Sequence, residues 1–260
     1  MKILAIDTSG QQAGAAIVDK YITIGEIMIN AQSGPKTWHH SEILMPAVER
    51  LFALSGQELA DMDYVAYTAG PGSFTGIRIG AATALGLARS IDKPAIAVPT
   101  LDALAYNVLC VMPRDLLVVP LMDARRGQVY AAIYRVGQAG EFSRITDYIA
   151  APIDDVLKRV GEFGANAFFL GDGADAYKPE IVAKYTSAIF APANSNRQRP
   201  SSVGLCAVHQ LKPDILPEGA ASSNDVVASS SNNPELIYIR DPQAVRSNTQ
   251  LKNDSQAVKT

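Results

Sequence analysis

Cysteine and long apolar runs are scarce in this 260-residue chain, and each scarcity excludes a class of protein. Two cysteines, Cys110 and Cys206, lie far apart and are too few for a disulfide scaffold. No apolar run approaches the roughly 18 residues that a membrane helix needs. The apolar start Met1–Ile6 meets Asp7 too soon for a signal peptide. These features predict a cytoplasmic protein without membrane contact.

An excess of basic residues is also missing. Lysine and arginine number 23 against 26 for aspartate and glutamate, so the formal net charge is −3. Binding to a nucleic acid through bulk charge is therefore disfavoured, because the phosphate backbone attracts a basic surface. Apolar residues make up 48% and charged residues 19%, which is typical of a folded globular protein.

Histidine, the commonest metal ligand, occurs three times. His39 and His40 are adjacent and would project about 100° apart on a helix. The residues four positions further on, Ile43 and Leu44, have no ligand atoms. We therefore predict no metal site.

The pattern of apolar residues predicts strands mixed with helices in two successive lobes, an α/β architecture. Expected strands are 3–6, 13–18, 21–29, 64–68, 94–98, 117–122, 128–135, 145–149 and 168–170. Expected helices are 41–54, 77–90, 101–109 after an N-cap at Thr100, 153–160, and 201–211 capped by Ser201 or Ser202.

Five segments follow from this pattern and from the composition. Residues 1–103 form the first lobe and residues 104–219 the second. Residues 220–233 are a Ser- and Asn-rich linker, and residues 241–260 are a polar tail; both are expected to be mobile. Residues 234–240 carry an apolar segment that we expect to dock on the body.

A loop at 70–76 follows an expected strand and precedes an expected helix, which is where a backbone can hold an anion. It lacks the lysine of a P-loop and the spacing of the dinucleotide fingerprint. A tight turn is the preferred interpretation, and weak phosphate contact is the alternative. The residues that would make this contact are Asp7, Ser9, Gly10, Gly72 and Ser73.

The expected helix after this loop has almost no polar face, since Arg78 is the only charge between Gly76 and Ala88. Such a helix should be covered on more than one side. Gly76, Gly80 and Ala84 recur every four residues and would let another backbone approach closely. We expect association with another chain through this helix and the preceding one, with burial inside the same chain as the alternative.

Several of these residues occur in motifs that resemble the TsaB (YeaZ) family. The motifs are Ile6-Asp7-Thr8-Ser9, His40-Ser41-Glu42-Ile43-Leu44-Met45-Pro46, Gly70-Pro71-Gly72-Ser73-Phe74-Thr75-Gly76-Ile77-Arg78, Asp123-Ala124-Arg125-Arg126-Gly127-Gln128-Val129-Tyr130, and Pro234 to Arg240. The similarity covers about residues 1 to 240. It implies a two-lobed actin/Hsp70-like (ASKHA) fold, with a mixed sheet and flanking helices in each lobe.

The resemblance also implies a function: a non-catalytic subunit needed for threonylcarbamoyl transfer to adenosine 37 of tRNAs that read ANN codons. Its implied partners are a TsaD-type catalytic paralogue, a TsaE-type ATPase, or a second copy when alone. The implied contact with tRNA is only through the complex, and the implied ATP and metal belong to the partner subunits. Carried over to this sequence, the interface candidates are Ile43, Leu44, Ala47, Val48, Leu51, Gly76, Ile77, Gly80, Ala84 and Leu87. The alternative is a small-molecule kinase or ATPase of the same fold.

Overall fold

A computed structural model describes residues 1–31, 38–108, 112–113, 116–136, 142–164, 166–211 and 236–237. The expected linker 220–233 and tail 241–260 lie outside the described residues. Of the expected docked segment 234–240, Leu236 and Ile237 are described, and both pack against the first core. The Ile237 amide donates a hydrogen bond of 2.7 Å to the Ala69 carbonyl.

The first sheet has five strands in the order β3-β2-β1-β4-β5. β1, β2 and β3 are antiparallel neighbours, whereas β4 runs parallel to β1 and β5 parallel to β4. The strands are β1 (Lys2–Asp7), β2 (Gln12–Asp19), β3 (Ile22–Asn30), β4 (Tyr64–Gly70) and β5 (Ala95–Pro99).

The second sheet repeats this order with β10-β7-β6-β11-β12, and two further strands extend it because β8 pairs with β6 and β9 with β8. β6 and β11 are parallel, as are β11 and β12. The strands are β6 (Leu117–Asp123), β7 (Gln128–Ala131), β8 (Tyr134–Val136), β9 (Phe142–Arg144), β10 (Ile149–Pro152), β11 (Ala167–Leu170) and β12 (Ile189–Phe190). The two lobes are therefore topological copies.

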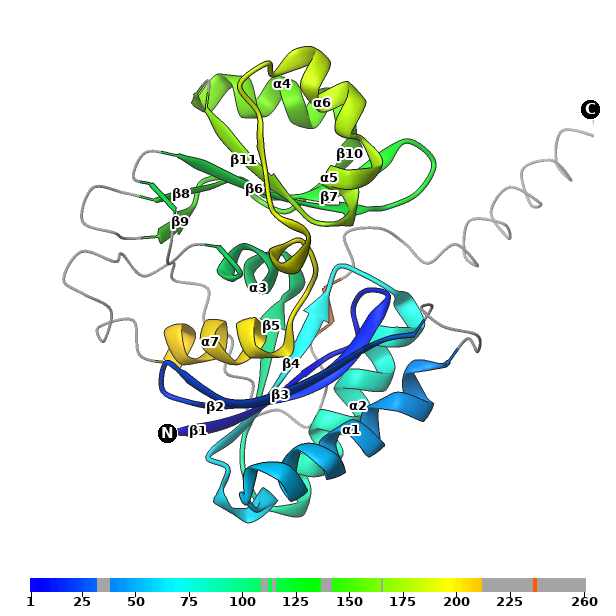
Figure 1. Cartoon of the computed structure of the whole chain (residues 1–260), viewed down its shortest axis with the longest axis vertical. Helices are drawn as coiled ribbons and strands as arrows, with labels where there is room; N and C mark the ends of the chain where they lie inside the picture. The colour runs from blue at the N-terminus through cyan, green and yellow to red at the C-terminus, as the bar shows by residue number, and fades with distance from the viewer. Residues whose placement is uncertain are drawn as a thin grey trace, which may run out of the picture.

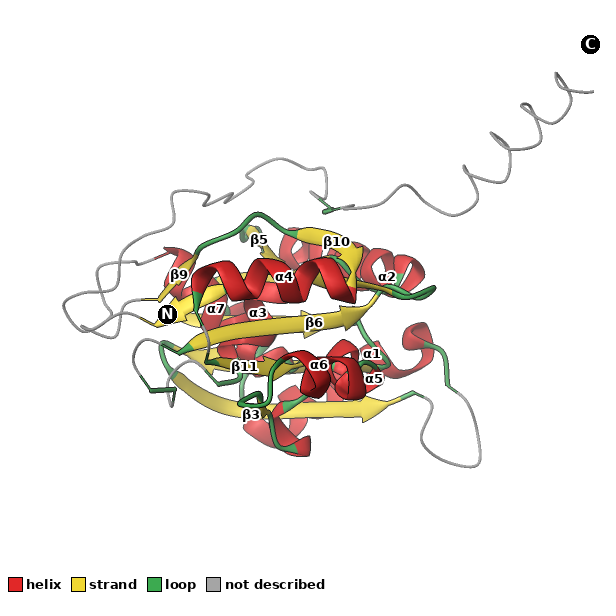
Figure 2. Ribbon diagram, turned by 90° about the horizontal axis from the view of Figure 1, so that it is seen from above, coloured by secondary structure: helices red, strands yellow, loops and turns green. Residues whose placement is uncertain are grey.

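Helices separate and cover the sheets (Figure 1). α1 and α2 cover the outer face of the first sheet, α7 and α3 lie between the sheets, and α4 and α6 cover the second sheet (Figure 1). Seen from above, α4 and α6 lie over the strands of the second sheet (Figure 2). The helices are α1 (His40–Ser55), α2 (Phe74–Ser90), α3 (Thr100–Tyr106), α4 (Ile153–Phe163), α5 (Asp172–Ala176), α6 (Lys178–Lys184) and α7 (Pro200–Leu211). Two 3-10 helices are η1 (Leu59–Asp61) and η3 (Ala193–Ser195).

Strand alternation supplies both faces of the first sheet with apolar side chains. In β1, Leu4 and Ile6 pack under α1 and α2, while Ile3 and Ala5 pack against α7. α7, which a boundary at residue 103/104 places in the second lobe, thus lies on the first sheet. α3 joins the core of the second sheet. The lobes share a continuous helical layer.

Several helix starts differ from the expectation. α2 begins at Phe74 rather than residue 77, because the Ser73 hydroxyl accepts a 3.2 Å hydrogen bond from the Gly76 amide. Thr100 is the first residue of α3 and not its cap, which is Pro99. Ser201 lies inside α7 and donates from its amide and hydroxyl to Glu26, so the capping group comes from β3 rather than from the helix itself.

Strand boundaries in the second lobe also differ. The expected strand 128–135 is split into β7 and β8, since the Ile133 amide donates to the Thr146 hydroxyl and leaves the ladder. Most of the expected strand 145–149 forms the link between β9 and β10. The sequence pattern missed β12 and the short helices α5 and α6, which are too brief to show a period.

Candidate functional site

The side chains predicted to meet a partner point into the protein instead. All the candidates on α1 and α2 except Leu87, which is partly buried, are buried against the first sheet or the turn after β1. The buried candidates are Ile43, Leu44, Ala47, Val48, Leu51, Gly76, Ile77, Gly80 and Ala84. The alternative of internal burial is therefore correct for these side chains, because the sheet needs this apolar cover.

The small residues of α2 do permit a close approach, but the approaching chain is the same one. A Cβ atom added at Gly76 would lie 2.1 Å from the Thr8 carbonyl oxygen, and one at Gly80 would lie 2.3 Å from Thr8 Oγ1. Thr8 Oγ1 also donates a 2.7 Å hydrogen bond to the Gly76 carbonyl. These glycines fix α2 against the end of β1.

The opposite face of the α1–α2 layer is exposed and carries large apolar side chains among charged ones such as Glu49, Arg50 and Arg89. On α1, Met45 is 38% exposed and Leu54 is 66% exposed. On α2, Phe74 is 38% exposed beneath the Arg78 guanidinium, which lies 3.8 Å from the ring centroid. A Cβ atom at Gly86 would meet nothing within 4 Å. We call this exposed side of α1 and α2 the outer face.

The corresponding layer of the second lobe is different in character. α4 buries Ile153, Val156, Leu157 and Val160 and exposes acidic and basic side chains in the intervening positions. Lys184 of α6 pairs with Asp154 at 2.6 Å, and Lys158 pairs with Asp155 at 3.4 Å. A charged surface of this kind is ordinary solvent-facing protein, whereas the outer face of α1 and α2 offers apolar area and open space.

The five residues predicted for phosphate contact do come together at the end of β1. Asp7 Oδ1 accepts hydrogen bonds from the Ser9 amide at 2.8 Å, the Ser9 hydroxyl at 2.7 Å and the Thr68 hydroxyl at 3.3 Å. Among the residues that the structure describes, Asp7 Oδ2 is buried with no hydrogen-bond partner. Burial raises the pKa of the Asp7 carboxyl, although these hydrogen bonds oppose the shift.

The donors of this turn are used within the protein. The Ser73 amide donates to the Ser9 carbonyl at 2.7 Å, and the Gly76 amide is capped by the Ser73 hydroxyl. A Cβ atom at Gly72 would lie 2.4 Å from the same Ser9 carbonyl. Gly10 faces the Gln198 side chain, whose Oε1 would lie 2.7 Å from an added Cβ atom. This geometry favours the turn interpretation over phosphate contact.

His40 contributes to the same packing. A hydrogen bond to the Gln11 carbonyl holds the half-buried imidazole, and a Cβ atom at Gly76 would lie 2.7 Å from its Nδ1. Burial lowers the pKa of His40, while the hydrogen bond to Gln11 opposes the shift. From the sequence, His40 was weighed as a metal ligand, so this packing role was missed, as was that of Thr8. The one available signal was the Gly76/Gly80 spacing.

Among the described residues, no group of three or more histidine, cysteine, aspartate or glutamate side chains could hold a metal ion. None of the helices in that part of the chain is long and apolar enough to cross a membrane.

Solved structures share this architecture. A YeaZ-like protein from Pseudomonas aeruginosa superposes with a TM-score of 0.68 at 22% identity, covering 92% of this chain and 99% of that one. YeaZ from the same organism gives a TM-score of 0.63 at 23% identity, covering 82% and 93%. With two sheets of the same strand order flanked by helices, the chain is a two-lobed α/β protein of the ASKHA class.

Sequence comparisons identify the family within this class. The model described as "TsaD: tRNA N6-adenosine threonylcarbamoyltransferase" matches residues 36–246. The tRNA threonylcarbamoyladenosine biosynthesis protein TsaB of Bacillus subtilis is 33% identical over 224 residues, covering 83% of this chain and 94% of the relative. Its Escherichia coli namesake is 35% identical over 178 residues, covering 68% and 74%. The chain belongs to the TsaB (YeaZ) family.

Proposed function

We propose that this chain is a non-catalytic partner subunit in threonylcarbamoyl transfer to adenosine 37 of tRNAs that read ANN codons. The similarity to proteins named for tRNA threonylcarbamoyladenosine biosynthesis supports the pathway. In this proposal a TsaD-type paralogue holds the catalytic site and its metal, and a TsaE-type ATPase binds the ATP. The tRNA contacts the assembled complex in the cytoplasm.

The observation that carries this proposal is the outer face of α1 and α2. It combines exposed Met45, Leu54 and Phe74 with the open backbone at Gly86, so a partner helix can approach closely without displacing a side chain. In the equivalent layer of the second lobe, α4 exposes charged side chains, although Val182 of α6 is 46% exposed. In the absence of the paralogue, a second copy would use this same face.

The chemistry of the Asp7 turn supports a non-catalytic role. The Ser9 amide and hydroxyl already serve Asp7, the Ser73 amide serves the Ser9 carbonyl, and Gln198 packs on Gly10. A kinase or ATPase needs such donors for the phosphates of its substrate. The kinase alternative therefore finds no support in the arrangement of this turn.

Light scattering after size exclusion tests the proposal on the full-length protein, run alone and with a TsaD-type paralogue. We expect a one-to-one complex with the paralogue and its loss in Gly86→Leu, because the leucine fills the space that a partner helix would use. Glu162→Leu is the matched control, since it adds the same exposed leucine to α4. The control should pair like the unchanged protein.

Two outcomes contradict the proposal. Absence of any complex at micromolar concentration would remove the partner-subunit role. ATP turnover by the chain alone, lost in Asp7→Ala, would establish the kinase or ATPase alternative. Equal pairing by Gly86→Leu and Glu162→Leu would retain a partner role but move the interface away from the outer face.

A further inference from the structure

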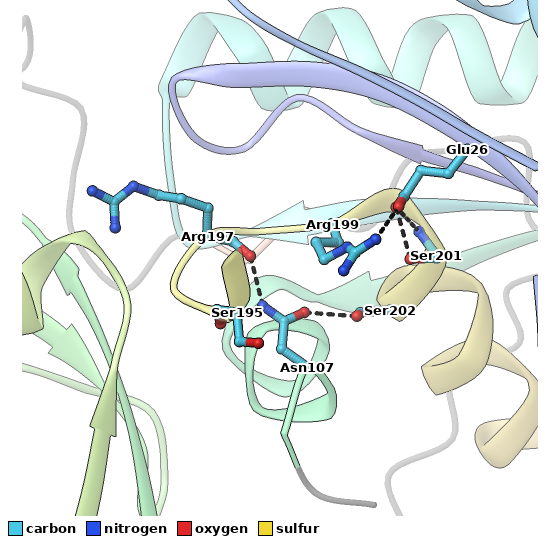
Figure 3. Close-up of polar contacts among 7 residues, drawn as sticks. All are labelled: Glu26, Asn107, Ser195, Arg197, Arg199, Ser201 and Ser202. Carbon is cyan, nitrogen blue, oxygen red and sulfur yellow. Dashed lines mark hydrogen bonds and ion pairs between the residues drawn. The ribbon is translucent and has the colours of Figure 1, made fainter. Parts of the chain in front are cut away.

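The segment 195–202 crosses from the second sheet to the first. Upstream of the segment, just after β12, the Ala191 amide donates to the Phe169 carbonyl at 3.0 Å. The segment itself ends in the first turn of α7, which packs on the first sheet. Figure 3 shows that polar side chains from β3 and from the end of α3 converge on it. These contacts distinguish it from an ordinary connecting loop.

The second lobe holds this segment through one buried contact and one exposed contact. Asn196 is buried, and its Oδ1 accepts a 2.6 Å hydrogen bond from the Gly171 amide at the end of β11. Arg197 Nη1 lies 2.8 Å from Asp175 Oδ2, but both side chains are substantially exposed and contribute little. The buried contact matters more, because loss of Asn196 would leave a buried amide without an acceptor.

Asn107, which follows α3 in the helical layer between the two sheets, holds the same segment. Its Nδ2 donates to the Ser195 carbonyl at 3.0 Å and to the Arg197 carbonyl at 2.6 Å (Figure 3). Its Oδ1 accepts from the Ser202 hydroxyl at 2.6 Å. A single amide side chain thus joins α3, the crossing segment and α7.

Glu26 of β3, a strand of the first sheet, provides a further anchor. Its carboxylate accepts from the Ser201 amide at 2.9 Å and the Ser201 hydroxyl at 2.7 Å, and it pairs with Arg199 (Figure 3). Burial alone would raise the pKa of Glu26, but the hydrogen bonds from Arg199 and Ser201 lower it. The carboxylate therefore stays charged and binds the N-terminus of α7.

Gln198 lies between these anchors and faces the turn after β1. It is 4% exposed, and its side chain packs directly on Gly10. The crossing segment consequently contacts the ends of β1 and β11, which belong to different sheets. Movement of one sheet relative to the other must break at least one of these contacts.

We propose that residues 195–202 act as a latch that couples the two lobes and prevents them from closing on a ligand as a clamp. The latch makes the protein one rigid body that presents the outer face of α1 and α2 in a fixed position. This property concerns the chain alone, so it does not depend on the identity of a partner.

Hydrogen exchange followed by mass spectrometry tests the latch on the full chain. Asn107→Ala removes bonds to the latch and α7 but touches neither Gly171 nor the turn at Gly10. We expect at least tenfold faster amide exchange in peptides covering residues 167–173 and 7–12, both distant from the substitution in sequence. Lys184→Ala is the control, since it removes an exposed polar contact outside the latch.

The result that would overturn the proposal is faster exchange confined to the latch and α7, because a local anchor would not transmit the change to β11 and β1. If Asn107→Ala does not fold, Ser202→Ala replaces it in the same exchange experiment, because it removes one hydrogen bond to Asn107. It should produce the same pattern with a smaller increase. Equal exchange in Ser202→Ala, Lys184→Ala and the unchanged protein would likewise refute the latch.

Discussion

The outer helical layers of the two lobes occupy equivalent places in the topology but differ in how much apolar surface they expose. α4 and α6 bury one apolar stripe and expose charged residues that pair with one another, such as Lys184 and Asp154. α1 and α2 bury an apolar stripe and expose further apolar side chains beside an open glycine. The sheet requires only the buried stripe. The exposed apolar side chains of α1 and α2 are therefore not needed to cover the sheet, and they support the interface proposed above.

Two glycines within α2 show the same contrast on a smaller scale. Gly80 lies against Thr8, where an added Cβ atom would be 2.3 Å from Oγ1, whereas Gly86 faces open space. They are six residues apart, which places them on different sides of the helix. The first glycine serves the packing of this chain, and the second leaves the space that the proposed partner would use.

The substitution Gly80→Leu should have the largest effect on folding. Its side chain would collide with Thr8 and separate α2 from β1, at a cost of about 3 kcal/mol in the free energy of unfolding. Gly86→Leu, the same change on the outer face, should leave stability unchanged or raise it by up to about 1 kcal/mol through helix propensity. Urea unfolding of both variants measures the contrast, and equal losses would show that the two faces do not differ.

Asp7→Asn should stabilise the protein by about 1–2 kcal/mol near neutral pH, since it removes a buried charge with an unpartnered oxygen. Burial raises the pKa of Asp7, so stability is lost as pH rises above the unfolded value and through the folded one. The gain should therefore shrink towards pH 4. Urea unfolding at both pH values measures it.

Asp123, at the equivalent end of β6, is the matched site for this second prediction. It accepts a 2.8 Å hydrogen bond from the Arg125 amide, and its carboxylate lies 3.2 Å from Arg125 Nη1. Asp123→Asn should produce no gain, because that charge is paired. Equal stabilisation at both strand ends would mean that the burial of Asp7 is not the cause.

A smaller effect is expected for His40→Gln on the inner side of the first lobe. Burial lowers the pKa of His40, so its contribution to stability is lost as pH falls below the ordinary value of about 6.5. Glutamine keeps a donor for the Gln11 carbonyl but does not titrate. The free energy of unfolding, measured with urea, should fall less between pH 7 and pH 5 in the variant than in the unchanged protein. The difference should be under about 1 kcal/mol.

His209 of α7 gives a comparison for this pH effect in the layer between the lobes. Burial lowers its pKa as well. His209→Gln should therefore reduce the pH dependence in the same direction, and the two substitutions together should reduce it further. An unchanged slope in the double variant would exclude both histidines as its source.

The smallest effect is expected on the charged layer of the second lobe. Lys184→Ala breaks the 2.6 Å pair with Asp154, but both side chains are exposed and surface pairs of this kind contribute little. Thermal unfolding and the pairing measured by light scattering should both be unchanged. A clear loss in either would mean that this layer is more than a solvated surface.

The sequence was sufficient for most of the elements and for the unusual character of α2. Long periodic segments such as α1 and α4 appear close to their expected bounds. Short or interrupted elements were missed, because α5 and α6 contain too few residues for a period and the break between β7 and β8 depends on Thr146. The residues predicted for the interface are buried against the first sheet or the turn after β1, apart from the partly buried Leu87.

The sequence by itself determined that α2 is apolar on nearly every side and that the chain holds two lobes of mixed strands and helices. Only the tertiary structure decided which side of α2 is inside, because a helix without a polar face has no period that marks its buried stripe. The sheet places Gly76 and Gly80 against Thr8 and leaves Gly86 open. The latch also depends on the tertiary structure, since Asn107 meets Ser195 across 88 residues of chain.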